Sequence, residues 1–92
     1  MGTYLMLGRY SHDAIKKISA KRTVEANKLV GQLGGEVKAG YAMLGKDDLL
    51  LIAEFPGNEQ AIKASVGLSK LLGVAFTTAP AVSVDEFDKL VG

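Results

Sequence analysis

Two short segments, far apart in the chain, carry the residue types best suited to chemistry. Arg9, Tyr10 and His12 lie close together near the start, and Asp47 and Asp48 are adjacent in the middle. Histidine has an unperturbed pKa near neutrality, which suits general acid–base catalysis, and a neighbouring carboxylate can orient the ring. His12 is therefore the candidate catalytic residue, with Asp48 as its orienting group.

The same residues have structural interpretations, which we favour. Arg9 could clamp a substrate carboxylate through two parallel hydrogen bonds, but a surface ion pair with Asp47 or Asp48 explains it equally simply. An aspartate in a turn more often bonds backbone amides than performs catalysis, which applies to Asp48. His12 falls in the first turn of a predicted helix, where an exposed side chain is ordinary.

Tyrosines offer a second kind of site. Tyr4 and Tyr10 share one face of a predicted strand, and Tyr41 is expected nearby, so the three could line a cavity for a small apolar or aromatic ligand. As ordinary sheet residues they need no ligand at all. The ligand-binding candidates from both arguments are Arg9, Tyr10, His12, Tyr41, Asp47 and Asp48.

Composition argues against several classes of function. The chain has no cysteine, and one histidine beside two adjacent carboxylates is a poor metal site, so neither a metal nor a cofactor is expected. With 11 basic and 10 acidic residues, and without aromatics among the lysines, nucleic acid is not an expected partner. The longest apolar run, 49–53, cannot span a bilayer, and no signal peptide is visible, so the expected location is cytoplasmic.

Hydrophobic periodicity predicts one α+β domain over residues 1–92, ordered β-α-β-β-α-β with a short C-terminal helix. The strands at 3–10 and 49–55 read as apolar on both faces, whereas Pro80 marks the last strand as an edge. The predicted elements are a strand at 3–10, a helix from Ser11 to Gly34 with a break or bend at 19–23, strands at 36–44 and 49–55, a helix capped by Asn58 and ended by Gly73, a strand at 74–82 and a helix at 84–91.

This order suggests the ferredoxin-like fold, an antiparallel four-stranded sheet of order 4-1-3-2 with both helices on one face. Alternation in the second strand puts Val37, Ala39, Tyr41 and Met43 on a single face. The other face of the sheet would leave apolar surface in water, so we expect a homodimer or larger homo-oligomer through that open face. Alternatively, the C-terminal helix folds across it.

The predicted topology also brings the candidate site residues together. The first strand ends at Arg9 and Tyr10, and the second strand ends at the hairpin of residues 45–48, at the same end of the sheet. Ser11 and His12 begin the first helix there. A site at this end would therefore draw on both segments.

Three stretches of the chain resemble the GYD-domain family: Thr3–Ser11 (Thr-Tyr-Leu-Met-Leu-Gly-Arg-Tyr-Ser), Ala26–Lys38 with its Leu-Gly-Gly helix end, and Ser83–Leu90. The resemblance covers nearly the whole chain and implies a single GYD-like domain of the dimeric α/β-barrel type. The Gly-x-Tyr-Asp signature of the family corresponds to Gly45–Asp48, where Asp47 replaces the tyrosine.

These features lead to two expectations about function. The first is a small oligomeric domain that binds a small molecule in a cavity between sheet and helices. The alternative is a metal-free isomerase, decarboxylase or cofactor-independent monooxygenase that uses His12 and Arg9, because enzymes of these kinds occur in the wider superfamily that the resemblance implies. The sequence leaves open whether the protein is an enzyme.

Overall fold

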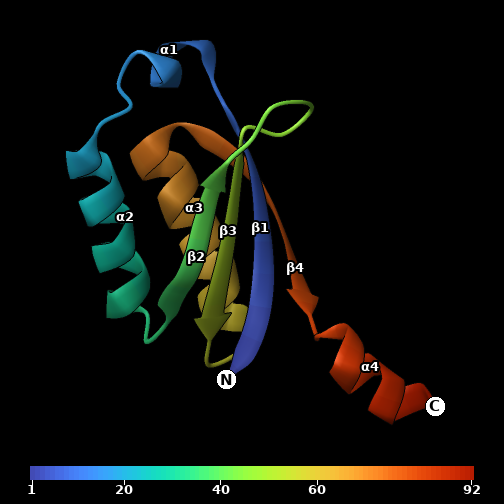
Figure 1. The fold of residues 1–92 in the computed structure, drawn as a ribbon. Coiled ribbons are helices and arrows are strands. Elements are labelled where there is room, and N and C mark those ends of the chain that lie inside the picture. The colour runs from blue at the N-terminus through green and yellow to red at the C-terminus, as the bar shows by residue number, and fades with distance from the viewer.

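The chain follows the order β-α-α-β-β-α-β-α and builds one sheet with its two long helices on one side (Figure 1). The computed structural model describes residues 1–92. The strands are β1 (Gly2–Tyr10), β2 (Glu36–Ala42), β3 (Leu49–Phe55) and β4 (Val74–Ala81). The helices are α1 (His12–Ile15), α2 (Ala20–Gln32), α3 (Asn58–Leu72) and α4 (Val84–Val91).

The sheet has the predicted topology. Its strand order is β2-β3-β1-β4, which is the order 4-1-3-2 counted from the other edge, and the three strand pairs are all antiparallel. The long helices α2 and α3 lie against the same face (Figure 1). The ferredoxin-like fold is thereby confirmed, with the two most apolar strands, β1 and β3, at its centre.

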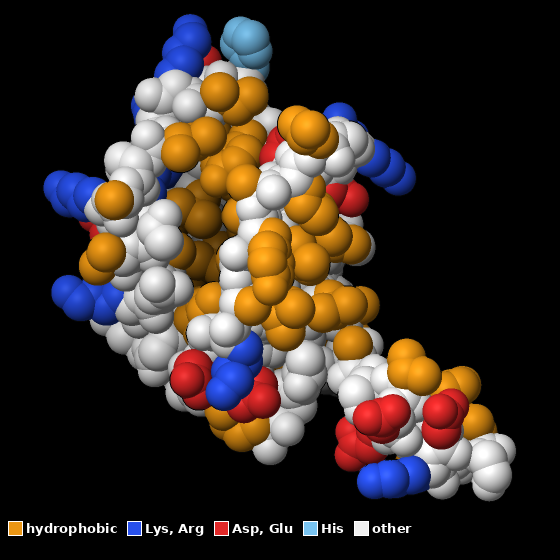
Figure 2. All heavy atoms as spheres, viewed as in Figure 1, with side chains coloured by type: hydrophobic (Ala, Val, Ile, Leu, Met, Phe, Trp, Pro, Cys, Tyr) orange, Lys and Arg blue, Asp and Glu red, His pale blue; other side chains and the backbone are white.

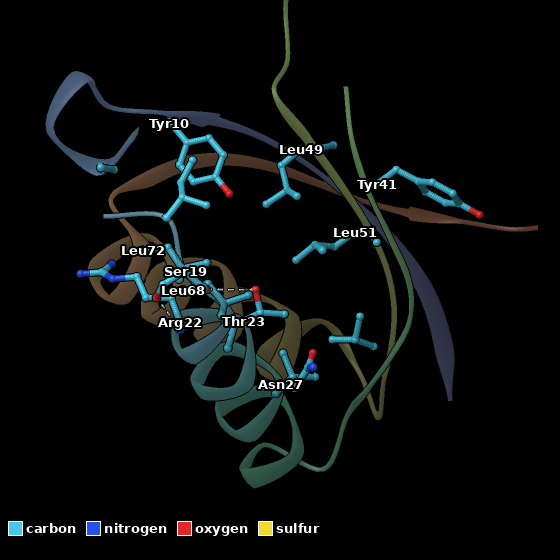
Figure 3. Close-up of a pocket in the computed structure, with 17 residues that line it drawn as sticks. Tyr10, Ser19, Arg22, Thr23, Asn27, Tyr41, Leu49, Leu51, Leu68 and Leu72 are labelled. Carbon is cyan, nitrogen blue, oxygen red and sulfur yellow. Dashed lines mark hydrogen bonds between the residues drawn. The ribbon is translucent and has the colours of Figure 1, made fainter. Parts of the chain in front are cut away.

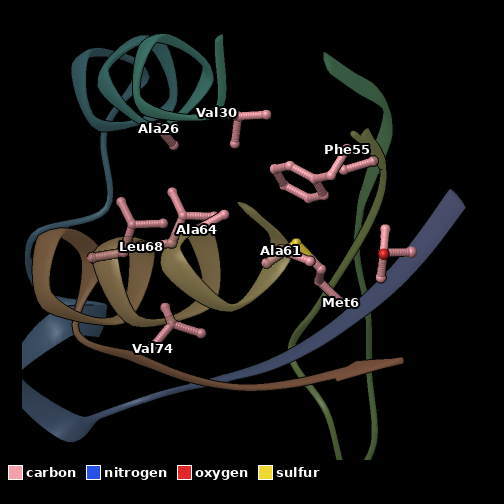
Figure 4. Close-up of a cluster of buried hydrophobic side chains, with 11 residues drawn as sticks. Met6, Ala26, Val30, Phe55, Ala61, Ala64, Leu68 and Val74 are labelled. Atoms are coloured by element: carbon pink, nitrogen blue, oxygen red, sulfur yellow. The ribbon is translucent and has the colours of Figure 1, made fainter. Parts of the chain in front are cut away.

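The hydrophobic core fills the layer between the sheet and the two long helices (Figure 4). Its largest fully buried side chains are Met6, Val30, Phe55, Leu68 and Val74. Each such side chain contributes about 1.5–3 kcal/mol when it leaves water, so this layer supplies most of the stabilisation of the protomer. None of the helices combines the length and the hydrophobicity that a membrane span requires.

Small residues let the core layers approach closely. Ala61 and Ala64 are buried on α3, where they face the sheet. A Cβ atom built on Gly67 would lie 3.2 Å from Leu29 Cδ1, so α2 and α3 pack tightly at this glycine. A glycine in the interior of a helix is unfavourable on its own, which already suggested close packing at this position. Gly73 ends α3 with φ +67°, a left-handed conformation that glycine adopts without strain.

The first helical segment breaks earlier than predicted. α1 is only His12–Ile15, capped by Ser11, whose hydroxyl accepts from the Ala14 N–H at 3.0 Å. The break falls at residues 16–19 rather than 19–23, because the Ser19 hydroxyl caps α2 by accepting from the Arg22 N–H at 3.3 Å.

The predicted faces of the second strand were wrong beyond its second residue. β2 ends at Ala42 rather than Leu44, and its pairing with β3 shifts between Val37 and Ala39. This bulge at Lys38 moves the following residues to the opposite face from the one that strict alternation predicts. Val37 therefore faces the helices, whereas Ala39 and Tyr41 share the opposite face with their β3 partners.

Asn58 is not the cap of α3 as predicted. Gly57 occupies the cap position, and no side chain caps the helix. The Asn58 side chain is therefore available for a hydrogen bond to β1. Its Oδ1 accepts a 2.5 Å hydrogen bond from the Tyr4 hydroxyl, while the Tyr4 ring packs edge-on against Phe55 with ring centres 5.7 Å apart. This bond satisfies the one polar atom of a tyrosine that is otherwise in the core.

The sheet face opposite α2 and α3 carries no helix. Along β1 the side chains of Tyr4 and Met6 are buried towards the helices, so Leu5 and Leu7 lie on the other side. We call this other side the open face; its central apolar residues are Leu5, Leu7, Leu50 and Ile52, with Ala39 and Tyr41 on β2. Figure 2 shows hydrophobic side chains gathered over the strands on this side.

The C-terminal helix does not cover the open face. α4 is capped by Ser83, whose hydroxyl accepts from the Glu86 N–H at 3.1 Å, as the predicted capping spacing indicated. It points away from the body of the domain, and none of its residues is buried (Figure 1). The apolar side chains of Val84, Phe87 and Leu90 are therefore exposed to solvent.

Candidate functional site

The end of β1 and the β2–β3 hairpin meet, as the topology predicted. The Asp48 N–H donates to the Gly8 carbonyl at 2.8 Å, and the Met43 N–H donates to the Asp48 carbonyl at 2.9 Å. Asp48 Oδ2 accepts from the Tyr10 N–H at 3.0 Å. Asp48 thus ties the hairpin to β1 through its backbone and its carboxylate, which is the structural role that we favoured from its position in a turn.

The remaining candidates at this end do not form a pocket together. Arg9 and His12 are both exposed, and the side chain of neither makes a hydrogen bond or an ion pair within the protein. Asp47 is half-buried and also makes no such contact, so the predicted ion pair between Arg9 and the aspartates is absent. No group of three or more potential metal ligands lies together. Hydrogen bonds to backbone groups hold the two segments side by side, but the candidate side chains do not contact one another.

A cavity lies instead between α2 and the β2 side of the sheet (Figure 3). It has a volume of about 320 Å³ and a mostly apolar wall. Its floor includes Leu68, Leu72 and Val30 of the core, and its sheet wall includes Leu49 and Leu51 of β3. In Figure 2 the same region appears as a hollow lined with hydrophobic atoms, so the cavity opens to solvent along the edge of the sheet.

Polar side chains stand at the edge of this apolar space, where Thr23 and Asn27 are exposed to solvent and Tyr10 is half-buried. The Tyr10 hydroxyl points into it from the end of β1, and Thr23 and Asn27 point into it from α2 (Figure 3). The Tyr10 hydroxyl and the Asn27 amide make no hydrogen bond within the protein, while the Thr23 hydroxyl donates to the Ser19 carbonyl at 3.5 Å. A bound molecule would therefore find hydrogen-bonding groups on both walls.

No charged group is directed into the centre of the cavity (Figure 3). Arg22 is the one charged residue of its lining, and its guanidinium donates to the Leu71 carbonyl at the end of α3. Figure 3 shows the Arg22 side chain directed away from the cavity centre. An ion at the cavity centre would lose its hydration with no opposite charge directed at it, so the wall favours a neutral ligand.

The sequence-predicted site residues do not all lie at the cavity. Of the six ligand-binding candidates, Tyr10 alone sends its side chain into the cavity; Tyr41 borders the cavity but its ring points away, towards the open face (Figure 3). Arg9 lies on a separate shallow depression, and neither Arg9 nor His12 lines the cavity. Tyr4 is also absent from it, because its hydroxyl bonds Asn58 within the core.

Thr23 and Asn27 were not among the sequence-predicted candidates. They are four residues apart, hence on one face of a helix, and they flank the apolar stripe that contains Ala26 and Val30. Polar residues at the margin of a core-facing stripe were the available signal. The cavity exists because α2 lies at a distance from the sheet. The hydrophobic pattern of a single segment does not predict that distance.

Comparisons with known proteins agree with this fold. The leucine response regulatory protein of Mycobacterium tuberculosis superposes with a TM-score of 0.59 at 7% sequence identity; the match covers 89% of this chain and 51% of that protein, about half its length. At this identity the likeness concerns the fold alone. A comparison with curated proteins found no match. The family model described as "GYD domain" matches residues 4–91, nearly the whole chain, and the protein therefore belongs to the GYD domain family.

Proposed function

We propose that the protein is an oligomeric domain that binds a small, neutral, largely apolar molecule in the cavity between α2 and the sheet. The observation that carries this proposal is the combination of an apolar wall with two hydrogen-bonding side chains, Tyr10 and Asn27, that have no partner in the protein. Ligand pockets commonly combine an apolar lining with a few polar groups that fix orientation. The volume of about 320 Å³ suits a molecule of two or three rings.

Binding can be tested with N-phenyl-1-naphthylamine, a neutral two-ring-system probe whose fluorescence rises in apolar surroundings. We expect saturable enhancement with the native protein and its loss in Thr23→Phe, because the larger side chain fills the cavity from α2. Val24→Phe is the matched control, since Val24 adjoins Thr23 but is 63% exposed and does not line the cavity. Equal probe binding by the two variants would contradict the proposal.

The polar contacts call for a separate pair of variants. Asn27→Leu keeps the volume of the side chain while removing its amide, whereas Lys28→Leu alters the next, exposed residue. With 1-naphthol, a neutral ligand that carries a hydroxyl, we expect Asn27→Leu to weaken binding about 5- to 10-fold, which corresponds to one hydrogen bond of roughly 1–1.4 kcal/mol. Lys28→Leu should leave the affinity unchanged, and a matching loss there would speak against a role for Asn27.

The oligomer in this proposal is a homodimer through the open face. Leu5, Leu7, Leu50 and Ile52 give that face an apolar centre, with Leu5 still 36% exposed despite its place on a central strand. Both long helices lie on the other face, and α4 points away. Covering apolar surface stabilises by about 25 cal/mol per Å², so association of two such faces is favourable.

Size-exclusion chromatography with light scattering at micromolar concentration tests this association. We expect twice the mass of one chain for the native protein and the mass of one chain for Leu50→Asp, which puts a charge at the centre of the open face. Val66→Asp is the control, because Val66 is 50% exposed on α3, on the opposite side of the domain. A native protein of single-chain mass would refute the dimer without affecting the cavity proposal.

A further inference from the structure

The open face carries opposite charges at its two ends. Arg9 follows Leu5 and Leu7 at alternate positions along β1 and therefore shares their face, next to the hairpin. At the far end, Glu54 of β3 lies directly opposite Glu36 of β2. Residues directly opposite one another on paired strands share a face, so both carboxylates belong to the open face.

Two of these charges have no counter-ion in the protomer. The single salt bridge joins Lys38 Nζ to Glu36 Oε2 at 3.6 Å, which leaves Glu54 half-buried beside a like charge. Like charges directly opposite each other on a sheet are destabilising. Arg9 is exposed and likewise has no acidic partner. The face thus ends in an unpaired cation on one side and an unpaired carboxylate on the other.

The apolar centre lies midway between these ends. Thr3 pairs with Glu54 in the register of β1 and β3, and Arg9 lies six positions further along β1, about 20 Å at roughly 3.3 Å per residue. The midpoint is the level of Met6, between Leu5 and Leu7. In a two-fold dimer both protomers use the same patch, so the patch must be complementary to itself. This patch is complementary to itself when the strands of the second copy run in the reverse direction, because its positive end then faces the negative end of the first copy.

We propose that a second copy of this chain binds the open face with its strand ends reversed, so that Arg9 of each protomer pairs with the partner's Glu54. The orientation rests on the dimer proposed above. A two-fold axis across the strands at the level of Met6 places each arginine over the opposite carboxylate end. An axis along the strands instead places Arg9 near the partner's Arg9 and Glu54 near the partner's Glu54, which is unfavourable for both pairs.

The absence of cysteine from the chain makes cross-linking a clean test of this orientation. Packed sheets lie about 10 Å apart, which is too far for a direct disulfide, so the reagent is a short bismaleimide that links two thiols. With it we expect the double variant Arg9→Cys/Glu54→Cys to form a covalent dimer on a denaturing gel. Either single variant should remain monomeric on that gel, because each new cysteine lies far from its own symmetry copy. A link within one chain is excluded because the two positions lie roughly 20 Å apart, beyond the reach of a short linker.

Charge reversal gives a second readout that requires no cross-link. Arg9→Glu and Glu54→Arg should each raise the dimer dissociation constant, by about 10- to 100-fold, since each places like charges together twice in the interface. Combining them should restore an affinity close to the native value. Analytical ultracentrifugation of the four proteins measures this, and circular dichroism checks that each is folded.

The outcomes separate the orientation from the dimer itself. A native dimer whose Arg9→Cys variant cross-links to itself, or whose charge reversals show no mutual rescue, overturns the orientation and leaves the dimer in place. A native protein that is monomeric overturns both. Cross-linking of the double variant alone, together with rescue by the combined charge reversal, supports the orientation.

Discussion

Replacing Asp48 with alanine should destabilise the protein while leaving its hairpin sequence otherwise intact. The Asp48 carboxylate accepts the Tyr10 N–H at 3.0 Å, and this N–H has no other acceptor within the protein once the side chain is removed. Hydrogen bonds to a charged group contribute about 1.5–3 kcal/mol, and because Asp48 is only half-buried we expect a value at or below the lower end of that range, about 1–2 kcal/mol.

The matched control is Asp47→Ala, which removes a carboxylate from the adjacent residue of the same turn. Asp47 makes no hydrogen bond or ion pair, so its loss should change stability by less than about 0.5 kcal/mol. For a domain of this size each kcal/mol shifts the melting temperature by about 4–8 °C, so Asp48→Ala should melt roughly 5–15 °C lower.

Thermal and urea denaturation of both variants at one protein concentration would measure this difference; the concentration must match because dimerisation adds to apparent stability. A restoration of stability by Asp48→Asn, whose amide oxygen is also an acceptor, would support the hydrogen bond as the cause. Equal, small losses in Asp48→Ala and Asp47→Ala would refute the view that Asp48 anchors the hairpin to β1.

Three further substitutions test other parts of the structure. Gly8→Ala should destabilise by about 1–3 kcal/mol in urea denaturation, because its Cβ atom would lie 2.6 Å from Val74 Cγ1 and 2.9 Å from Phe76 Cε1. Gly31→Ala should instead raise stability by up to about 1 kcal/mol in the same assay, since α2 gains a better helix former with nothing within 4 Å of the new methyl group. His12→Ala should bind N-phenyl-1-naphthylamine as the native protein does, because His12 does not line the cavity; lost binding in a folded variant would favour the alternative role in catalysis.

The fold could be predicted because its signals are local and agree with one another. The apolar runs at 3–10 and 49–55 identify the two central strands, and Pro80 marks an edge. Ser83 was predicted to cap the last helix from the side-chain chemistry of one residue and its spacing to Glu86. Each of these features needs only a few neighbouring residues, so the sequence is enough to recognise it.

The candidate site depends on features that no short segment encodes. The bulge at Lys38 transfers Ala39 and Tyr41 to the open face, and nothing in the local sequence distinguishes it from regular alternation. The cavity exists because α2 stands away from the β2 side of the sheet, which is a property of how layers pack. Thr23 and Asn27 acquire their role only from that separation, whereas Tyr10 could be named from its place at the end of a strand.

The sheet serves as a wall for both proposed sites, and β3 shows how they remain separable. Leu49 and Leu51 face the cavity, while Leu50 pairs with Leu7 on the open face. Because alternate residues of a strand point to opposite sides, a change at Leu50 acts on association and a change at Leu51 acts on the cavity, although the two residues are adjacent. Tyr41 joins the two, since its backbone borders the cavity and its ring lies on the open face, so it is the position at which an effect of ligand on dimerisation would first be sought.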